Sequence, residues 1–378
     1  MANTILGTDH ALAVKLWEAK TYMEALQESA FGTLFGSGAV TLPTEFKTRG
    51  FTGDEITVAH VNQLTGGPIM EGETARGNEE AIDKGYFTMR LGYNRKPIEV
   101  PGNDTMDQQR TKVLFQDVGR EALTDYCVQL LDFSTFNQLA GYTATSFTGG
   151  GYTYSGNKLR AVLGHNTALA PSVGRQLWAG TSNVKDEDLS SGDTLELRHI
   201  DMALEKIDSN RHPIKMLGNV RYQLWISPEQ AFDLKHSTDT RTWYDIQRAK
   251  AEGGKSWNVE ALTKKSGAWF LGEYSNVEIY VHSRIAYGVN SSTSAPITTV
   301  RRAVLVGKNA LFYGTPWNSG NPQSTGKGVP VKYSEEVLDY TELLGICGKM
   351  MYGLKKPQPS NAPDLGTFVI STYAAPHA

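Results

Sequence analysis

Residues 104–139, DTMDQQRTKVLFQDVGREALTDYCVQLLDFSTFNQL, carry the longest helical pattern of the chain. Asp104 or Thr105 can cap the start of a helix, because both side chains accept a backbone N–H. The spacing predicts one helix over residues 106–139, about 50 Å long at about 1.5 Å per residue. That length exceeds the usual span of a globular helix and indicates a structural spine. The apolar positions that recur every three or four residues are Val113, Leu114, Val118, Ala122, Leu123, Tyr126, Cys127, Leu130, Leu131, Phe133 and Phe136.

Two strands and a long acidic loop precede this spine. Alternating apolar residues predict strands over 54–61 and 86–100, and Pro97 places the second of them at a sheet edge or a bend. The loop between them is rich in glycine. Residues 71–83 hold five acids and one base, a local charge of −4, at Glu71, Glu73, Glu79, Glu80, Asp83 and Arg76.

Helices and strands alternate along the rest of the chain. A helix is expected over residues 9–35, capped by Asp9 and broken by Gly32, Gly36 and Gly38. Residues 141–192 read as a glycine-rich loop with short strands. Ser227, Pro228 and Gln230 form a helix-start signal. The chain is therefore of the α+β class, with further helices over 195–207, 228–236 and 243–251 and strands over 220–226, 277–282, 299–306, 310–313, 329–337 and 366–372.

Composition excludes several classes of protein. The 378 residues are 40% hydrophobic and 20% charged, include 38 glycines, and have a net charge of −3. Disorder needs low hydrophobicity with high net charge, and nucleic-acid binding usually needs a basic surface. Two cysteines cannot form a disulfide framework. The chain has neither a long apolar run for a membrane helix nor the pattern of a signal peptide, so we expect it to fold in a reducing cytoplasm.

Known catalytic and metal-binding motifs are missing from the sequence. The best phosphate-loop match, residues 151–158, has Asn157 where the motif needs lysine. The eight histidines are scattered, and Cys127 and Cys347 lie among apolar residues, as core cysteines do. The pair Arg301 and Arg302 is too short for a nucleic-acid groove. We therefore expect no catalytic, cofactor or metal site.

Several short segments, in their order and spacing, resemble the major capsid proteins of tailed phages, in particular the N-four-like podophage group. The resemblance is closest over residues 9–140 and thinner over 195–372, while residues 141–192 do not align. The matching segments are 53–57 (GDEIT), 64–66 (LTG), 77–80 (GNEE), 106–110 (MDQQR), the pair Asp132 and Phe136, 303–311 (AVLVGKNAL) and 364–370 (DLGTFVI).

This resemblance implies the Hong Kong 97-like capsid fold and a structural role in the icosahedral shell around double-stranded phage DNA. The implied partners are further copies in hexamers and pentamers, a separate scaffolding protein, a portal, decoration or cement proteins, and DNA held without specific binding. The implied location is the virion, after assembly in the bacterial cytoplasm. The implied parts are an N-terminal arm (1–51), an extended hairpin or E-loop (52–103), the P-domain spine helix (104–140), mixed P- and A-domain segments (141–300), and P-domain strands with the tail (301–378).

An E-loop this long and rich in glycine cannot bury itself, so we expect it to lie on a neighbouring subunit. Its acidic tip comprises Glu71, Glu73, Arg76, Asn78, Glu79 and Glu80. Candidate partners on the neighbour's spine helix are Arg110, Lys112 and Arg120. The alternatives are an encapsulin-like nanocompartment shell, a β-rich tail or glycan-binding virion protein, and a hydrolase whose site is assembled only in space.

Overall fold

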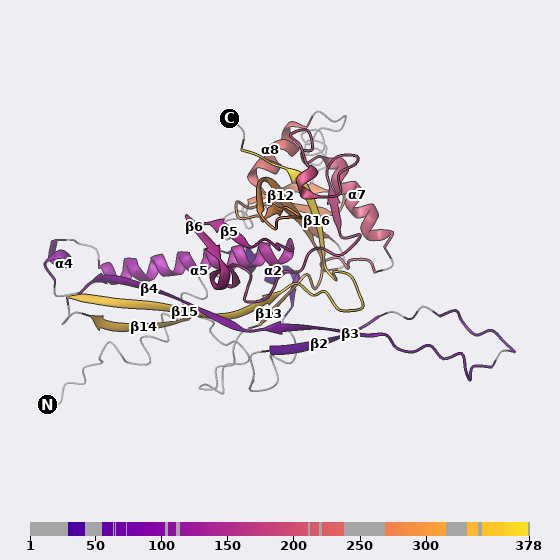
Figure 1. Ribbon diagram of the computed structural model, residues 1–378, viewed down its shortest axis with the longest axis horizontal. Helices are drawn as coiled ribbons and strands as arrows, with labels where there is room; N and C mark the ends of the chain where they lie inside the picture. Colours follow the sequence, from indigo (N-terminus) through magenta and orange to yellow (C-terminus); the bar gives the residue numbers. More distant parts are fainter. Residues whose placement is uncertain are drawn as a thin grey trace, which may run out of the picture.

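The structure is a computed structural model, and it describes residues 29–41, 55–62, 64, 66–72, 74–102, 105–110, 114–210, 212–218, 221–237, 269–314, 331–338, 342–376. A long helix lies along one sheet, a second sheet with two helices forms a lobe beside it, and a β-hairpin projects from the body (Figure 1). The expected helix over 243–251 lies outside the described residues.

The spine consists of two helices, α4 (Met106–Arg110) and α5 (Phe115–Leu139), so the prediction of a single helix over 106–139 is wrong. Leu114 has an extended backbone, with φ −74° and ψ 109°. The Gln108 side chain accepts the Phe115 N–H at 3.2 Å. This bond satisfies a backbone donor in the first turn of α5, so a second helix starts there. Thr105 caps α4 by accepting the Gln108 N–H at 3.3 Å. At about 1.5 Å per residue, the 25 residues of α5 span about 37 Å.

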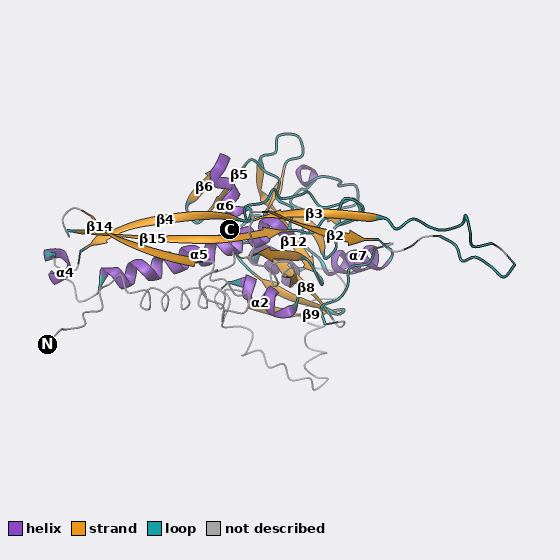
Figure 2. Cartoon of the chain, turned by 90° about the horizontal axis from the view of Figure 1, so that it is seen from below, coloured by secondary structure: helices purple, strands orange, loops and turns teal. Residues whose placement is uncertain are grey.

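The first sheet lies along α5 (Figure 2). Its central strand, β15 (Leu343–Lys355), was not predicted, because its glycines lower strand propensity. A Cβ at Gly353 would lie 2.5 Å from the Arg90 carbonyl oxygen, so the close packing requires glycine there. Pro97 lies on an edge strand, as predicted. The other strands are β4 (Gly92–Pro101), β14 (Val331–Leu338), β13 (Leu311–Gly314) and β1 (Val40–Thr41).

The second sheet is buried on both faces. Trp225 and Val304 pack in the core that contains α5, while their neighbours Leu224 and Leu305 pack in the core that contains α7 (Leu197–Asp208) and α8 (Pro228–His236). This explains why its strands read as continuous apolar runs. The strands are β7 (Gln176–Trp178), β16 (Thr367–Tyr373), β12 (Pro296–Val306), β8 (Tyr222–Ile226), β10 (Val277–Val281), β9 (Trp269–Tyr274) and β11 (Tyr287–Val289).

Local signals fix the starts of both covering helices. Ser227 accepts the Gln230 N–H at 3.3 Å, and Gln230 accepts the Ser227 N–H at 2.9 Å, which confirms the predicted capping box of α8. A second capping box starts α7, where His199 Nδ1 accepts the Glu196 N–H at 3.1 Å. Histidine is not a usual capping partner, so this second box has no recognisable signal in the sequence.

Two antiparallel hairpins lie outside the main sheets. One pairs β2 (Glu55–Val61) with β3 (Lys84–Arg90), and residues 62–83 extend beyond it; we call residues 55–90 the arm. The other pairs β5 (Ser146–Gly149) with β6 (Tyr152–Ser155) and leads into α6 (Leu159–Val162).

Helix α2 (Ala30–Ser37) contains Gly32 and Gly36, so the expected helix break at these glycines is wrong. Asp132 supplies the reason, because its carboxylate accepts the Ala30 N–H at 3.0 Å and fixes the start of α2. Leu34 is fully buried against α5. Tertiary packing therefore overrides the poor helix propensity of glycine. The part of the 9–35 helix before Ser29 lies outside the described residues.

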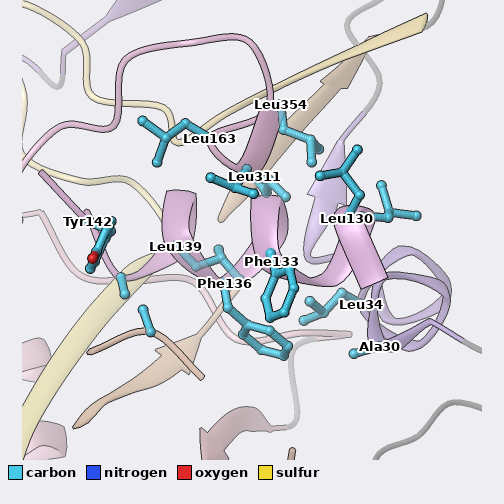
Figure 3. Packing of buried hydrophobic residues seen from close by; sticks show 14 of the residues in the cluster. Ala30, Leu34, Leu130, Phe133, Phe136, Leu139, Tyr142, Leu163, Leu311 and Leu354 are labelled. Carbon is cyan, nitrogen blue, oxygen red and sulfur yellow. The ribbon is translucent and has the colours of Figure 1, made fainter. Parts of the chain in front are cut away.

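The last three turns of α5 form the centre of the main core. Every residue from Leu130 to Leu139 is buried. Figure 3 shows Phe133, Phe136 and Leu139 among side chains from α2, the turn after α6, and the first sheet. The polar members are paired, since Asn137 Nδ2 donates to the Val162 carbonyl at 3.0 Å and Gln138 Nε2 to the Leu163 carbonyl at 2.5 Å. This helix end therefore joins segments from the whole chain.

Candidate subunit-contact surfaces

The base of the arm is fixed to the body, whereas its far end is exposed. Ile56, Phe87 and Met89 on one face of the hairpin bury against Phe312 of β13. Large apolar side chains on the rest of the arm are 41–66% exposed, namely Val61, Leu64, Ile69, Met70, Ile82 and Tyr86. Exposed apolar clusters of this kind mark surfaces that a partner covers.

The acidic side chains of the tip form hydrogen bonds within their own loop. Glu80 accepts the Gly66 N–H at 2.6 Å, and Glu79 accepts the Gly77 N–H at 2.7 Å. Asn78 Nδ2 donates to the Thr74 carbonyl at 3.0 Å, and Gly77 takes the positive φ of 98° that the turn needs. The adjacent carboxylates therefore bond to separate parts of the loop. Glu71 and Arg76 are exposed, and Glu73 lies outside the described residues.

The predicted basic partners differ in their environments. Arg110 is exposed at the end of α4, and Lys112 lies outside the described residues. Arg120 is paired within its own chain, because its guanidinium lies 2.5 Å from Glu335 of β14 and 3.5 Å from Asp117. In one chain α4 and the start of α5 lie at the opposite end of the molecule from the projecting part of the arm (Figure 1).

A second exposed apolar cluster lies at the spine end. Its side chains come from α4, the start of α5 and β14, and they are 37–63% exposed, at Met106, Leu114, Val118, Val337 and Leu338. One chain thus presents apolar surface at two distant ends. Two different surfaces suit a head-to-tail contact between copies, which can close into a ring.

Asp132 is a fully buried carboxylate with several donors. Its oxygens accept hydrogen bonds from Ser29 Oγ at 2.6 Å and Arg284 at 2.6 Å, in addition to the Ala30 amide. His282 Nε2 lies 3.5 Å away. One helical turn later, the Phe136 ring packs 5.0 Å from the His282 ring. The pair Asp132 and Phe136, noted in the sequence only for its spacing, therefore joins α2, α5 and the segment after β10.

Arg302 has a structural role that the sequence did not reveal. It is buried, and its guanidinium binds Asp186 at 2.8 Å and donates to the Gly141 carbonyl at 2.9 Å. Asp186 also accepts the Val289 N–H at 2.9 Å and the Trp178 indole N–H at 3.0 Å. Only the fold brings these distant residues together, and they link the end of α5 to the second sheet.

The two cysteines lie at buried or half-buried positions. Cys127 is buried, which raises the pKa of its thiol to about 12, and it packs as the expected core residue. Cys347 is half-buried in β15 opposite Pro97. Within the described parts of the chain, no three His, Cys, Asp or Glu side chains could jointly hold a metal ion. Of the described helices, none is both long and apolar enough to cross a membrane.

Comparisons with solved structures give capsid proteins of phages. The chain is similar to the capsid of Ralstonia phage GP4, with 23% identity, 93% of each chain covered and a TM-score of 0.70. It is also similar to the capsid of cyanophage Pam1, with 16% identity, 89% of each chain covered and a TM-score of 0.62. For the capsid of Helicobacter pylori bacteriophage KHP30 the values are 12%, 92% of each chain and 0.58. These likenesses show the fold, which is the expected phage capsid fold. A search of curated proteins gave no match.

A family model described as phage capsid protein matches residues 6–376, nearly the whole chain. The two sheets, the spine helix and the projecting arm occur together in a chain that matches capsid structures over most of its length. The chain therefore belongs to the phage capsid protein family, whose members are structural proteins of the virion shell.

Proposed function

We propose that this protein is the major capsid protein of a tailed phage, and that its copies form hexamers and pentamers of an icosahedral shell around double-stranded DNA. The observation that carries the proposal is the arm, which projects exposed apolar side chains and an acidic tip away from its own body. Exposed apolar surface of this kind marks a place where a partner binds, and here that partner is another copy of the chain. The podophage subgroup stays a prediction.

In this proposal the parts of the chain have the roles that the sequence resemblance implies. Residues 1–51 are the N-terminal arm, 52–103 the E-loop, 104–140 the P-domain spine, 141–300 the P- and A-domain segments, and 301–378 P-domain strands and tail. Strand β4, at the end of the E-loop range, pairs with β15 along ten residue pairs. The described segment that projects is therefore the β2–β3 hairpin with residues 62–83.

Contacts between copies are proposed to join the acidic tip to basic groups on a neighbour. Arg110 and Lys112 at the start of the spine are candidate partners. Arg120 already binds Glu335 in its own chain, so it would have to share its charge with the incoming carboxylate. A near-neutral chain, with a net charge of −3, suits a shell that encloses DNA without binding it tightly. A scaffolding protein, portal and decoration proteins are proposed as further partners, with assembly in the host cytoplasm.

Co-expression with the proposed scaffolding protein, followed by electron microscopy, tests this function, and we expect closed shells. The variant Glu79→Lys/Glu80→Lys reverses the acidic tip and should reduce particle yield while the subunit stays soluble. The matched control is Glu205→Lys/Asp208→Lys, which reverses two exposed acids on α7. Discrete monomers of the natural chain would contradict the capsid function, and an unchanged yield from the tip variant would reject the proposed contact.

A further inference from the structure

A hollow of about 1010 Å³ lies along β4, beside the middle of α5 and the β5–β6 hairpin with α6. We call it the β4 groove. Among the described residues, no aspartate or glutamate lines it, whereas five basic residues do. In a chain with more acids than bases, such a concentration of positive charge indicates an anionic ligand. The basic residues are Arg90, Arg95, Lys96, Lys158 and Arg160.

Three of these cations are available to a ligand. Lys96, Lys158 and Arg160 are exposed, and among the described residues none of the three pairs with a carboxylate. Lys96 Nζ lies 5.6 Å from the centre of the Tyr126 ring, and Lys158 Nζ donates to the Tyr152 hydroxyl at 2.7 Å. Aromatic rings thus hold the ammonium groups at the groove without neutralising them.

The groove also contains buried polar atoms without partners. Asn94 Nδ2 and His165 Nε2 are both buried, and neither forms a hydrogen bond with another described residue. Buried polar atoms are almost always paired in folded proteins, so these two atoms mark an unusual polar site in the wall of the groove. The His165 ring lies close against the strand, because a Cβ at Gly92 would come within 2.4 Å of it.

The outer edge of β4 is open among the described strands, since β4 pairs only with β15. Every residue from 90 to 97 lines the groove, and this stretch includes the first part of β4. An open strand edge binds an extended polypeptide through backbone hydrogen bonds, and side-chain sites beside it add specificity. A DNA duplex could bind the cations through its phosphates but would leave this edge unpaired. The edge therefore favours a peptide.

We propose that the β4 groove binds the acidic tip, residues 66–83, of a second copy of this chain. The described residues of that segment form no strand and carry Glu71, Glu79, Glu80 and Asp83, which match the cations of the groove. Within one chain the arm points away from the body that holds the groove, so the occupant comes from another copy (Figure 1). This inference rests on the proposed contact between arm and neighbour, and it names a receptor other than the spine helix.

A charge swap tests the assignment. Lys158→Glu/Arg160→Glu reverses two exposed cations, and we expect about a tenfold loss of particle yield for two weakened charge contacts per subunit. Combining it with Glu79→Lys/Glu80→Lys should raise the yield about threefold above that of the tip variant, because the paired signs are opposite again. The rescue is partial, because the loop bonds that Glu79 and Glu80 accept from Gly77 and Gly66 stay lost. Lys206→Glu/Lys215→Glu, at two exposed lysines outside the groove, is the control and should assemble normally.

The outcomes separate this assignment from the proposed function. If the tip variant fails to assemble while the groove variant assembles normally, the groove assignment is wrong and the arm contact stands. Rescue of the tip variant by Arg110→Glu, but not by the groove variant, also overturns the groove. A groove variant that assembles normally but loses binding to a duplex oligonucleotide would identify a nucleic-acid surface instead. Circular dichroism of each unassembled subunit confirms folding, and Lys158→Gln/Arg160→Gln replaces any variant that misfolds.

Discussion

Replacing Asp132 with alanine should lower the free energy of unfolding of the subunit more than the substitution of any exposed residue. The carboxylate is fully buried and accepts from Ser29 and Arg284, each at 2.6 Å, and from the Ala30 amide at 3.0 Å. Removing one partner of a buried ion pair costs about 3–5 kcal/mol, because the other partner loses its counter-charge. Asp132→Asn keeps the shape and one accepting oxygen, so it should cost about 1.5–3 kcal/mol.

Urea unfolding of the unassembled subunit measures these losses, with the slope checked to show that cooperativity is unchanged. Hydrogen exchange at the Ala30 amide is a second measurement, because that N–H bonds to the carboxylate and should exchange faster in both variants. Arg284→Ala combined with Asp132→Ala should cost less than the sum of the single changes. A loss below about 1 kcal/mol for Asp132→Ala would refute the reasoning, since an exposed pair would give that value.

Two further predictions concern buried charge and pH. Lys356 and Asp364 form a buried pair at 2.8 Å, so Lys356→Met should cost about 3–5 kcal/mol of unfolding free energy in the same urea assay. Lys356→Met/Asp364→Leu should recover only part of it, because Asp364 also accepts from the Ser172 N–H and hydroxyl. Burial lowers the pKa of His165 and of His199 to about 4, against 6.5 in an unfolded chain. The unfolded state therefore binds more protons between these values, so stability should be full above pH 6.5 and fall toward pH 4. His199→Gln should make urea midpoints at pH 7 and pH 5 differ less, and an unchanged pH dependence would contradict the assignment.

Local patterns in the sequence predicted the elements that are stabilised mainly by interactions between residues close in the chain. The start signal at Ser227 and Pro228 predicted α8, because capping involves only neighbouring residues. The alternation over 54–61 predicted β2, and the apolar spacing predicted α5 with Cys127 in its core. The order and spacing of short segments predicted the capsid family, which the family model confirms.

Tertiary structure decided what depends on distant neighbours. Strand β15 is rich in glycine and becomes a strand because β14 and β4 pair with both of its edges. Helix α2 persists through two glycines because Asp132, about a hundred residues later, caps its start. The β4 groove and the Asp186–Arg302 pair likewise join residues far apart in the chain. Local propensity amounts to less than about 1 kcal/mol per residue, whereas a buried charge or a paired strand edge contributes more, so packing prevails where the two disagree.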